Sequence, residues 1–241
     1  MYKKIITDDG FSIYYNDEEV FRLTKPELKI EELQRSFDFV PWDNYFDKGC
    51  RYRTTSRILV ANDSYELLPV KPLYQPSYVN KLESYGSIDR DYNDAPASLL
   101  RTSAFDVMIR QWADVIPFKF DKFSIHQIRT TDNGNPTPEG RHVDGTDWTG
   151  VYVVRRYNIT QSSVKTMFWT ITDELIVDEV LPQGSLITFC DKYFTHCVTN
   201  LERLEDREPC FRDVFVITFP EHGLNRELEE SNKEIIDSVR K

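Results

Sequence analysis

One stretch of the chain, Gly140-Arg141-His142-Val143-Asp144-Gly145, sets a histidine and an aspartate one residue apart in the middle of a β-rich half. On a strand, side chains two residues apart point to the same face, so His142 and Asp144 would lie together. An imidazole and a carboxylate on one face can take two neighbouring positions around a metal ion. The motif is short and needs support from residues elsewhere in the chain.

The residues around this stretch predict a fold made mainly of strands with flanking helices. Seven short strand-like segments are separated by turns rich in Gly, Pro and Asn, and they cover residues 123–129, 150–157, 165–172, 175–180, 185–190, 194–199 and 212–219. Many short strands at this spacing are typical of a jelly roll or a barrel. We therefore predict a jelly-roll core over residues 118–220.

Residues 1–117 are predicted to pack strands, helices and a loop on this core, within one domain of residues 1–241. The expected elements are two short strands within 11–24, a helix over 26–39, a strand over 51–60 and a helix over 97–116. Residues 67–95 are rich in Pro, Tyr, Asn and Asp, which predicts a long loop of the kind that often forms a lid. The charged residues 221–241 predict a C-terminal helix.

Composition and charge narrow the possible partners. The formal net charge of −10 gives an average field that repels phosphate backbones and anionic lipid surfaces, which argues against nucleic acid and membranes as partners. No apolar run approaches the roughly 20 residues that span a bilayer, and the N-terminus lacks the apolar core of a secretory signal. The cysteines form no C-x-x-C pair, which favours free thiols over a zinc site. We therefore expect a cytoplasmic protein.

A third metal ligand would have to come from a later, neighbouring strand, and His196 is the candidate. It follows Asp144 by 196 − 144 = 52 residues, which leaves room for about four strands of typical length. Two histidines and one carboxylate would complete the facial ligand set of non-haem Fe(II) oxygenases. The competing interpretation of His196 is a buried histidine that serves only the core.

Two groups of arginines could bind anions. Arg212 begins a strand that is otherwise nearly all apolar, and its guanidinium needs an anionic partner there. That partner could be Asp213 or another acid of the protein, or the distal carboxylate of a bound dicarboxylic acid. Further upstream, alternation puts Arg51, Arg53 and Arg57 on one face of a strand, where they form either a solvated edge or an anion-binding mouth.

Four further residues are candidates for substrate contacts. Alternation places Gln127 and Arg129 on one face of their strand and His126 on the other. Arg129 could pair with a substrate carboxylate or could sit in a salt bridge. Asp147 and Trp148 follow the metal motif closely enough to line the mouth of the site, although a turn aspartate and a packing tryptophan fit the sequence equally well.

Taken in order, these motifs resemble one known family. The set consists of His126-Gln127-Ile128-Arg129, His142-x-Asp144-Gly145, Arg156-x-Asn158-Ile159, Pro182-x-Gly184, His196, and Arg212-Asp213 followed by an apolar strand. It resembles the iron(II)- and 2-oxoglutarate-dependent dioxygenases, and among them the bacterial group that includes isoleucine hydroxylases. One departure is the run Gln161-Ser162-Ser163-Val164, where such relatives often show Gly-Gly-Glu.

The resemblance implies a double-stranded β-helix, the cupin-like jelly roll, with Fe(II), 2-oxoglutarate and O2 as cofactors. It implies that His142, Asp144 and His196 bind iron and that Arg212 holds the far carboxylate of 2-oxoglutarate. A halogenase of this class would usually have a small residue in place of Asp144, so hydroxylation is favoured. The expected reaction hydroxylates an aliphatic carbon of a free amino acid or similar small metabolite and releases succinate and carbon dioxide.

Two alternatives remain open. The same cofactors could drive desaturation or ring closure of an amino-acid-derived or carrier-bound substrate. The chain could instead be a non-catalytic, metal-binding cupin-like module, in which His142, Asp144 and His196 hold a structural zinc or nothing.

Overall fold

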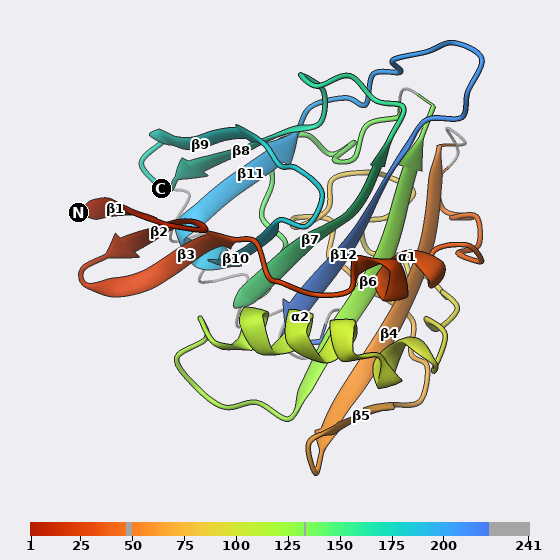
Figure 1. Ribbon diagram of the computed structural model, residues 1–241, viewed down its shortest axis with the longest axis horizontal. Helices are drawn as coiled ribbons and strands as arrows, with labels where there is room; N and C mark the ends of the chain where they lie inside the picture. Colours follow the sequence, from red (N-terminus) through yellow and green to blue (C-terminus); the bar gives the residue numbers. More distant parts are fainter. Residues whose placement is uncertain (47–49, 133, 222–241) are drawn as a thin grey trace.

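Two antiparallel β-sheets form the core of the protein in the computed structural model, which describes residues 1–46, 50–132 and 134–221 (Figure 1). Within these residues the large sheet has the strand order β1-β2-β3-β10-β7-β12-β6-β4-β5, and the small sheet has the order β11-β8-β9. The strands are β1 Tyr2–Thr7, β2 Gly10–Tyr15, β3 Glu18–Thr24, β4 Arg51–Ala61, β5 Ser64–Leu67, β6 Lys122–Thr131, β7 Trp148–Tyr157, β8 Lys165–Thr170, β9 Leu175–Val180, β10 Leu186–Cys190, β11 Phe194–Val198 and β12 Phe211–Phe219.

The predicted jelly-roll core is confirmed. The seven strands expected within residues 118–220 are present as β6 to β12, with ends that agree to within a few residues. β3 pairs with β10 and β4 pairs with β6, so both belong to the large sheet. The N-terminal half therefore completes one of the two layers as well as packing on them.

The hydrophobic pattern does not predict the two edge strands of the large sheet, β1 and β5. The side chains of β1 are almost all exposed, and β5 is only four residues long. β1 buries neither face, so its sequence has no alternation of polar and apolar residues. β5 does alternate, with Tyr65 and Leu67 packed against the core, but four residues are too few to give a clear signal.

Helix α1 covers Ile30–Arg35 and is shorter than the predicted 26–39. From Ser36 the chain continues in tight turns, because the N–H groups of residues 36 to 38 each bond to the carbonyl three residues earlier. The Ser36 hydroxyl adds a bond of 2.7 Å to the Leu33 carbonyl. These local bonds replace the helical pattern that the apolar spacing predicts.

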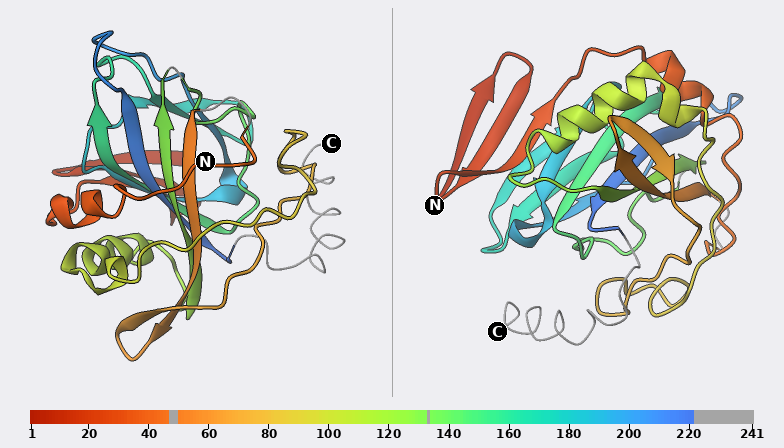
Figure 2. Two further views of the ribbon diagram at one scale, coloured as in Figure 1. Left: turned by 90° about the vertical axis from the view of Figure 1, so that its right-hand side faces the viewer. Right: turned by 90° about the horizontal axis from the view of Figure 1, so that it is seen from below.

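Helix α2 covers Ser103–Ala113, after a 3₁₀ turn at Leu99–Arg101, and is shorter than the predicted 97–116. The hydroxyl of Thr102 accepts a hydrogen bond of 3.2 Å from the N–H of Phe105 and so caps the helix. The left view of Figure 2 shows α1 and α2 on one face of the large sheet. Trp112 of α2 is fully buried in the core beneath the helix.

From Leu68 to Ala95 the chain forms the long irregular segment that the sequence predicts. It lies on the face of the large sheet opposite the two helices (Figure 2, left view). Its contribution to the wall of a cavity between the sheets consists of Gln75, Asn80, Leu82 and Tyr85. The predicted helix over 221–241 lies, beyond Glu221, outside the described residues. In the described part of the chain, no helix is long and apolar enough to cross a membrane.

The contact between α2 and the large sheet predicts a specific sensitivity at Gly150. A Cβ atom there would lie 2.5 Å from Cδ1 of Trp112. We therefore expect Gly150→Ala to lower the free energy of unfolding by about 1–3 kcal/mol, measured by chemical denaturation. The added cost of the alanine should shrink in a Trp112→Leu background. If the effects of the two substitutions on the free energy of unfolding are additive, the contact with Trp112 does not explain the cost of the alanine.

Candidate metal centre

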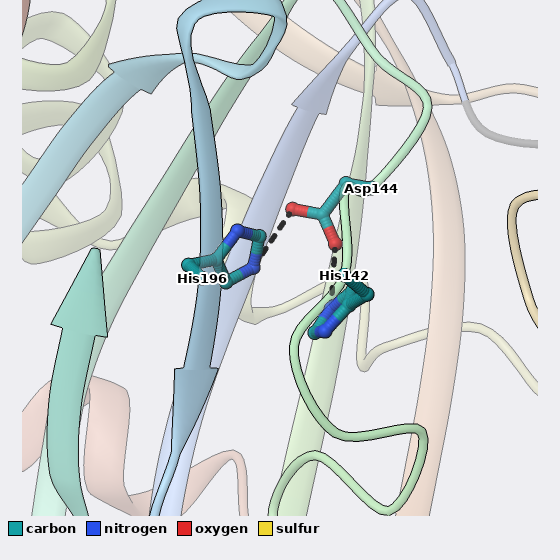
Figure 3. Close-up of side chains that lie close together, drawn as sticks. All are labelled: His142, Asp144 and His196. Carbon is teal, nitrogen blue, oxygen red and sulfur yellow. Dashed lines mark ion pairs between the residues drawn. The ribbon is translucent and has the colours of Figure 1, made fainter. Parts of the chain in front are cut away.

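His142, Asp144 and His196 converge on the cavity between the two sheets (Figure 3). Nε2 of His142 lies 3.5 Å from Oδ1 of Asp144, and Nε2 of His196 lies 3.7 Å from Oδ2 of the same carboxylate. The three potential ligand atoms all lie within 4.8 Å of one another. The sequence prediction that these residues meet in space is confirmed.

A single backbone bridge brings the motif to His196. Residues 141–147 form no strand, and instead His142 and His196 exchange both of their backbone hydrogen bonds, at 3.0 and 2.9 Å. His196 belongs to β11 in the small sheet, where it pairs with Phe168 of β8. The exchange sets the two imidazole rings next to each other, with ring centroids 4.4 Å apart.

Local contacts orient both imidazoles so that Nε2 points to Asp144. Nδ1 of His142 lies 2.8 Å from the Gly140 carbonyl oxygen, so Nδ1 carries the proton and Nε2 is left to bind a cation. The ring of His196 lies between Phe168 and Phe189, at centroid distances of 5.2 and 5.0 Å. Burial lowers the pKa of His196 to about 4, which keeps this imidazole neutral and able to ligate.

The charge around His142 is negative. Burial opposes protonation of its imidazole, but the carboxylates of Asp144 and Glu139 outweigh burial and raise the pKa of His142 to about 9. An excess of negative charge is what a divalent cation would neutralise. A cation that binds at neutral pH therefore displaces a proton from His142.

Asp191 fixes the loop that carries Asp144, a role that the sequence does not predict. Its carboxylate accepts hydrogen bonds from the backbone N–H groups of Asp144, Gly145 and Thr146, at 3.0, 2.8 and 3.3 Å. Asp191 begins a 3₁₀ turn, Asp191–Tyr193, directly after β10, and only 3% of its surface is exposed. A buried carboxylate with three backbone donors holds the Asp144 backbone in one position.

Arg212 lies on the cavity wall without an acidic partner in the described residues. Only 4% of its surface is exposed, and its Nε finds no hydrogen-bond partner there. Asp213 is not its partner, because that side chain points to the opposite face of β12 and binds Arg129. Burial, with the positive charge of Arg156, lowers the pKa of Arg212 to about 9. Such a guanidinium suits an anionic ligand.

Thr166 of β8, in the small sheet, lines the same cavity as Arg212 of β12 and offers a second polar group. Its Oγ1 is buried and unpaired among the described residues. The cavity thus offers two polar groups, unpaired within the described residues, to the far carboxylate of 2-oxoglutarate. A nitrogen–nitrogen–oxygen donor set on one side of an ion leaves coordination positions open. The residues present fit both the metal and the oxoacid.

The four tentative substrate residues do not line this cavity. Gln127 is fully buried on the other face of β6, where its amide binds Ser36 at 2.8 Å. Arg129 forms a two-pronged salt bridge with Asp213, at 2.6 and 2.8 Å, which is the structural alternative considered for it. Trp148 is buried in the core and Asp147 is exposed. His126, by contrast, is on the cavity side.

The chain matches the family model described as 2OG-Fe dioxygenase over residues 34–218, more than half of its length. No curated protein sequence matches it. Among solved structures it resembles a bsmA homolog from Methylobium petroleophilum, with a TM-score of 0.69 and 18% identity, covering 85% of this chain and 91% of the other.

Two further solved structures are similar. IDO from Bacillus thuringiensis has a TM-score of 0.60 and 17% identity, covering 78% of this chain and 81% of the other. The Fe(II)/α-ketoglutarate-dependent dioxygenase TqaL has a TM-score of 0.56 and 16% identity, covering 78% of this chain and 73% of the other. At such identities these likenesses establish a shared fold.

The contacts of Asp191 predict that Asp191→Asn weakens Fe(II) binding by about 10- to 100-fold, because an amide accepts through one oxygen and turns a donor toward the backbone N–H groups. The measurement is an anaerobic Fe(II) titration of the purified protein. Asp178→Asn is the control, since its carboxylate forms an exposed pair with Lys165. An unchanged affinity in folded Asp191→Asn protein would contradict the role of Asp191.

Proposed function

Because this chain belongs to the 2OG-Fe dioxygenase family, whose enzymes use Fe(II), 2-oxoglutarate and O2, we propose that it hydroxylates an aliphatic C–H bond of a free amino acid or a similar small metabolite. The observation that carries the proposal is the convergence of His142, Asp144 and His196 on the cavity that also holds the unpaired Arg212. In this proposal the first three residues bind iron and Arg212 binds the far carboxylate of 2-oxoglutarate.

When bound, the iron, 2-oxoglutarate and O2 supply an oxidative decarboxylation that gives succinate, carbon dioxide and an oxidant for C–H bonds. The residues of this chain hold the reactants and keep water away. The apolar side chains of the cavity wall include Ile128, Val151, Phe168, Ile187, Val214 and Val216. Such a wall suits an aliphatic group next to the metal and limits side reactions with water.

The presence of Asp144 supports hydroxylation as the outcome. Its carboxylate lies close to both histidines and would be the third protein ligand of the iron, which a halogenase of this class would lack. Desaturation and ring closure use the same residues, and product mass separates them, since hydroxylation adds an oxygen atom whereas desaturation removes two hydrogen atoms. Membership of an enzyme family argues against the non-catalytic cupin-like module.

The proposed ligand set predicts a spectroscopic signature. Anaerobic addition of Fe(II) and 2-oxoglutarate should produce a weak visible charge-transfer band, which His142→Ala should abolish because one of three protein ligands is lost. Absorption spectra of the two proteins provide the measurement. If well-folded wild-type protein with both additions shows no band, the assignment of the site is wrong.

The isolation of Arg212 predicts its effect on the cosubstrate. Arg212→Gln should raise the KM for 2-oxoglutarate by about 10- to 100-fold, the loss expected for a charge-assisted hydrogen bond to a carboxylate. Iron affinity in the absence of 2-oxoglutarate should stay within about twofold of wild type. Arg110→Gln, at an exposed helix pair, is the matched control. Equal KM values for wild type and Arg212→Gln would mean that another residue binds the far carboxylate of 2-oxoglutarate.

A further inference from the structure

A second group of buried arginines lies on the cavity wall and has no part in the proposed function so far. Arg51 and Arg53 of β4 each expose 7% of their surface and face the cavity. Arg57, the third arginine of the same strand face, points elsewhere and pairs with Glu221 at 3.0 Å. For Arg51 and Arg53 the solvated-edge interpretation of the sequence is therefore wrong.

The guanidinium groups of this cluster keep unused donors. Arg51 donates from Nη2 to the Pro136 carbonyl at 3.0 Å, and Arg53 contacts Nδ1 of His126 at 3.3 Å. Nε of both arginines is buried and has no partner among the described residues. Behind them Arg90 is fully buried, and its Nε and Nη1 are likewise unpaired within the described part of the chain.

Two acids, Asp43 and Glu139, lie near this cluster and help to raise the pKa of Arg51, but their close contacts are with other groups. Asp43 is buried, but its carboxylate accepts hydrogen bonds from the hydroxyls of Tyr85 and Tyr92, at 2.8 and 3.2 Å. Glu139 places Oε1 3.5 Å from Nε2 of His142. Within the described residues, neither acid forms a salt bridge with an arginine of the cluster. The three guanidinium groups therefore keep buried nitrogen atoms that no carboxylate of the described residues accepts from.

This cluster is separate from the position proposed for 2-oxoglutarate. Strand pairing places Arg51 opposite Thr130 and Thr130 opposite Arg212, so the two arginines lie two strands apart, or about 10 Å between Cα atoms. The charged neighbours of Arg51 are Glu139 and Asp43, whereas that of Arg212 is Arg156. One 2-oxoglutarate molecule at Arg212 would therefore leave Arg51 and Arg53 unpaired.

We propose that Arg51 and Arg53, with Arg90 behind them, form a second anion-binding subsite that receives a carboxylate of the substrate. The subsite rests on the proposed function, because it uses the same cavity. A carboxylate there adds negative charge beside three guanidinium groups and accepts hydrogen bonds from nitrogen atoms that are otherwise unpaired among the described residues. The substrate is thus held at its carboxylate end on β4, and its aliphatic part extends along the apolar wall toward His142, Asp144 and His196.

The test uses full-length protein loaded anaerobically with Fe(II) and saturating 2-oxoglutarate, so that the Arg212 position is filled. Isobutyrate and its neutral near-isostere isobutyramide are the probes, titrated by calorimetry. We expect isobutyrate to bind at one site per chain and at least tenfold more tightly than isobutyramide. Equal binding of the two probes, or no saturable binding of isobutyrate, would overturn the subsite.

Single substitutions identify the residues that bind isobutyrate. Arg51→Gln and Arg53→Gln should each weaken isobutyrate binding at least tenfold, while Arg57→Gln, on the same strand face, should leave it unchanged. The Tm of each ligand-free variant is measured as well, because Arg51 also donates to the Pro136 carbonyl and Arg53 contacts His126, and a loss of isobutyrate binding counts only in folded protein. An isobutyrate affinity that neither substitution changes would contradict the assignment. If inorganic phosphate binds more tightly than isobutyrate, the subsite recognises a phosphate group and the proposed carboxylate is wrong.

The experiment separates this inference from the proposed function. The visible band of the Fe(II) and 2-oxoglutarate complex should persist in Arg51→Gln and Arg53→Gln, because neither residue contacts the metal ligands. A band without isobutyrate binding would overturn only the substrate subsite. Absence of the band in wild-type protein would overturn the proposed function itself.

Discussion

The reciprocal backbone hydrogen bonds between His142 and His196 are the interaction on which the site depends. They join a loop that precedes a strand of the large sheet to β11 of the small sheet. Asp191, at the end of β10 in the large sheet, holds the next three residues of the same loop. The geometry of the ligand set is therefore fixed by the closure of the two sheets on each other and requires no regular strand at the motif itself.

The fold could be predicted to the extent that its strands bury a face. β6 to β12 carry apolar or alternating residues because they enclose the core, and their positions follow from the sequence. The exposed β1 has no such pattern, and the length of α1 depends on hydrogen bonds of Ser36 that apolar spacing cannot reveal. The pairing of β3 and β4 into the large sheet joins residues far apart in the chain, which local patterns do not encode.

The site could be predicted where spacing and order carry the information, as for His142, Asp144 and His196. Asp191 gave no signal, since its role arises from three backbone groups 45 to 47 residues away. Alternation correctly put Gln127 and His126 on opposite faces of β6, but it could not say which face looks into the cavity. Both faces of that strand are buried, one by the cavity wall and one beneath α1, so burial gives no guide to function.

The arginines on the two faces of the large sheet differ in their partners. This difference distinguishes arginines with a structural role from arginines that are available to a ligand. On the helix side, Arg129 is neutralised by Asp213 within the protein. On the cavity side, unpaired nitrogen atoms remain, in the described part of the chain, on Arg51, Arg53 and Arg212. Acids placed beside them would remove the cost of an isolated buried charge, but they would also occupy the positions that anions need. In the proposed function, the protein gives up some stability by leaving these nitrogen atoms unpaired, and the cavity is thereby arranged in advance to bind carboxylates.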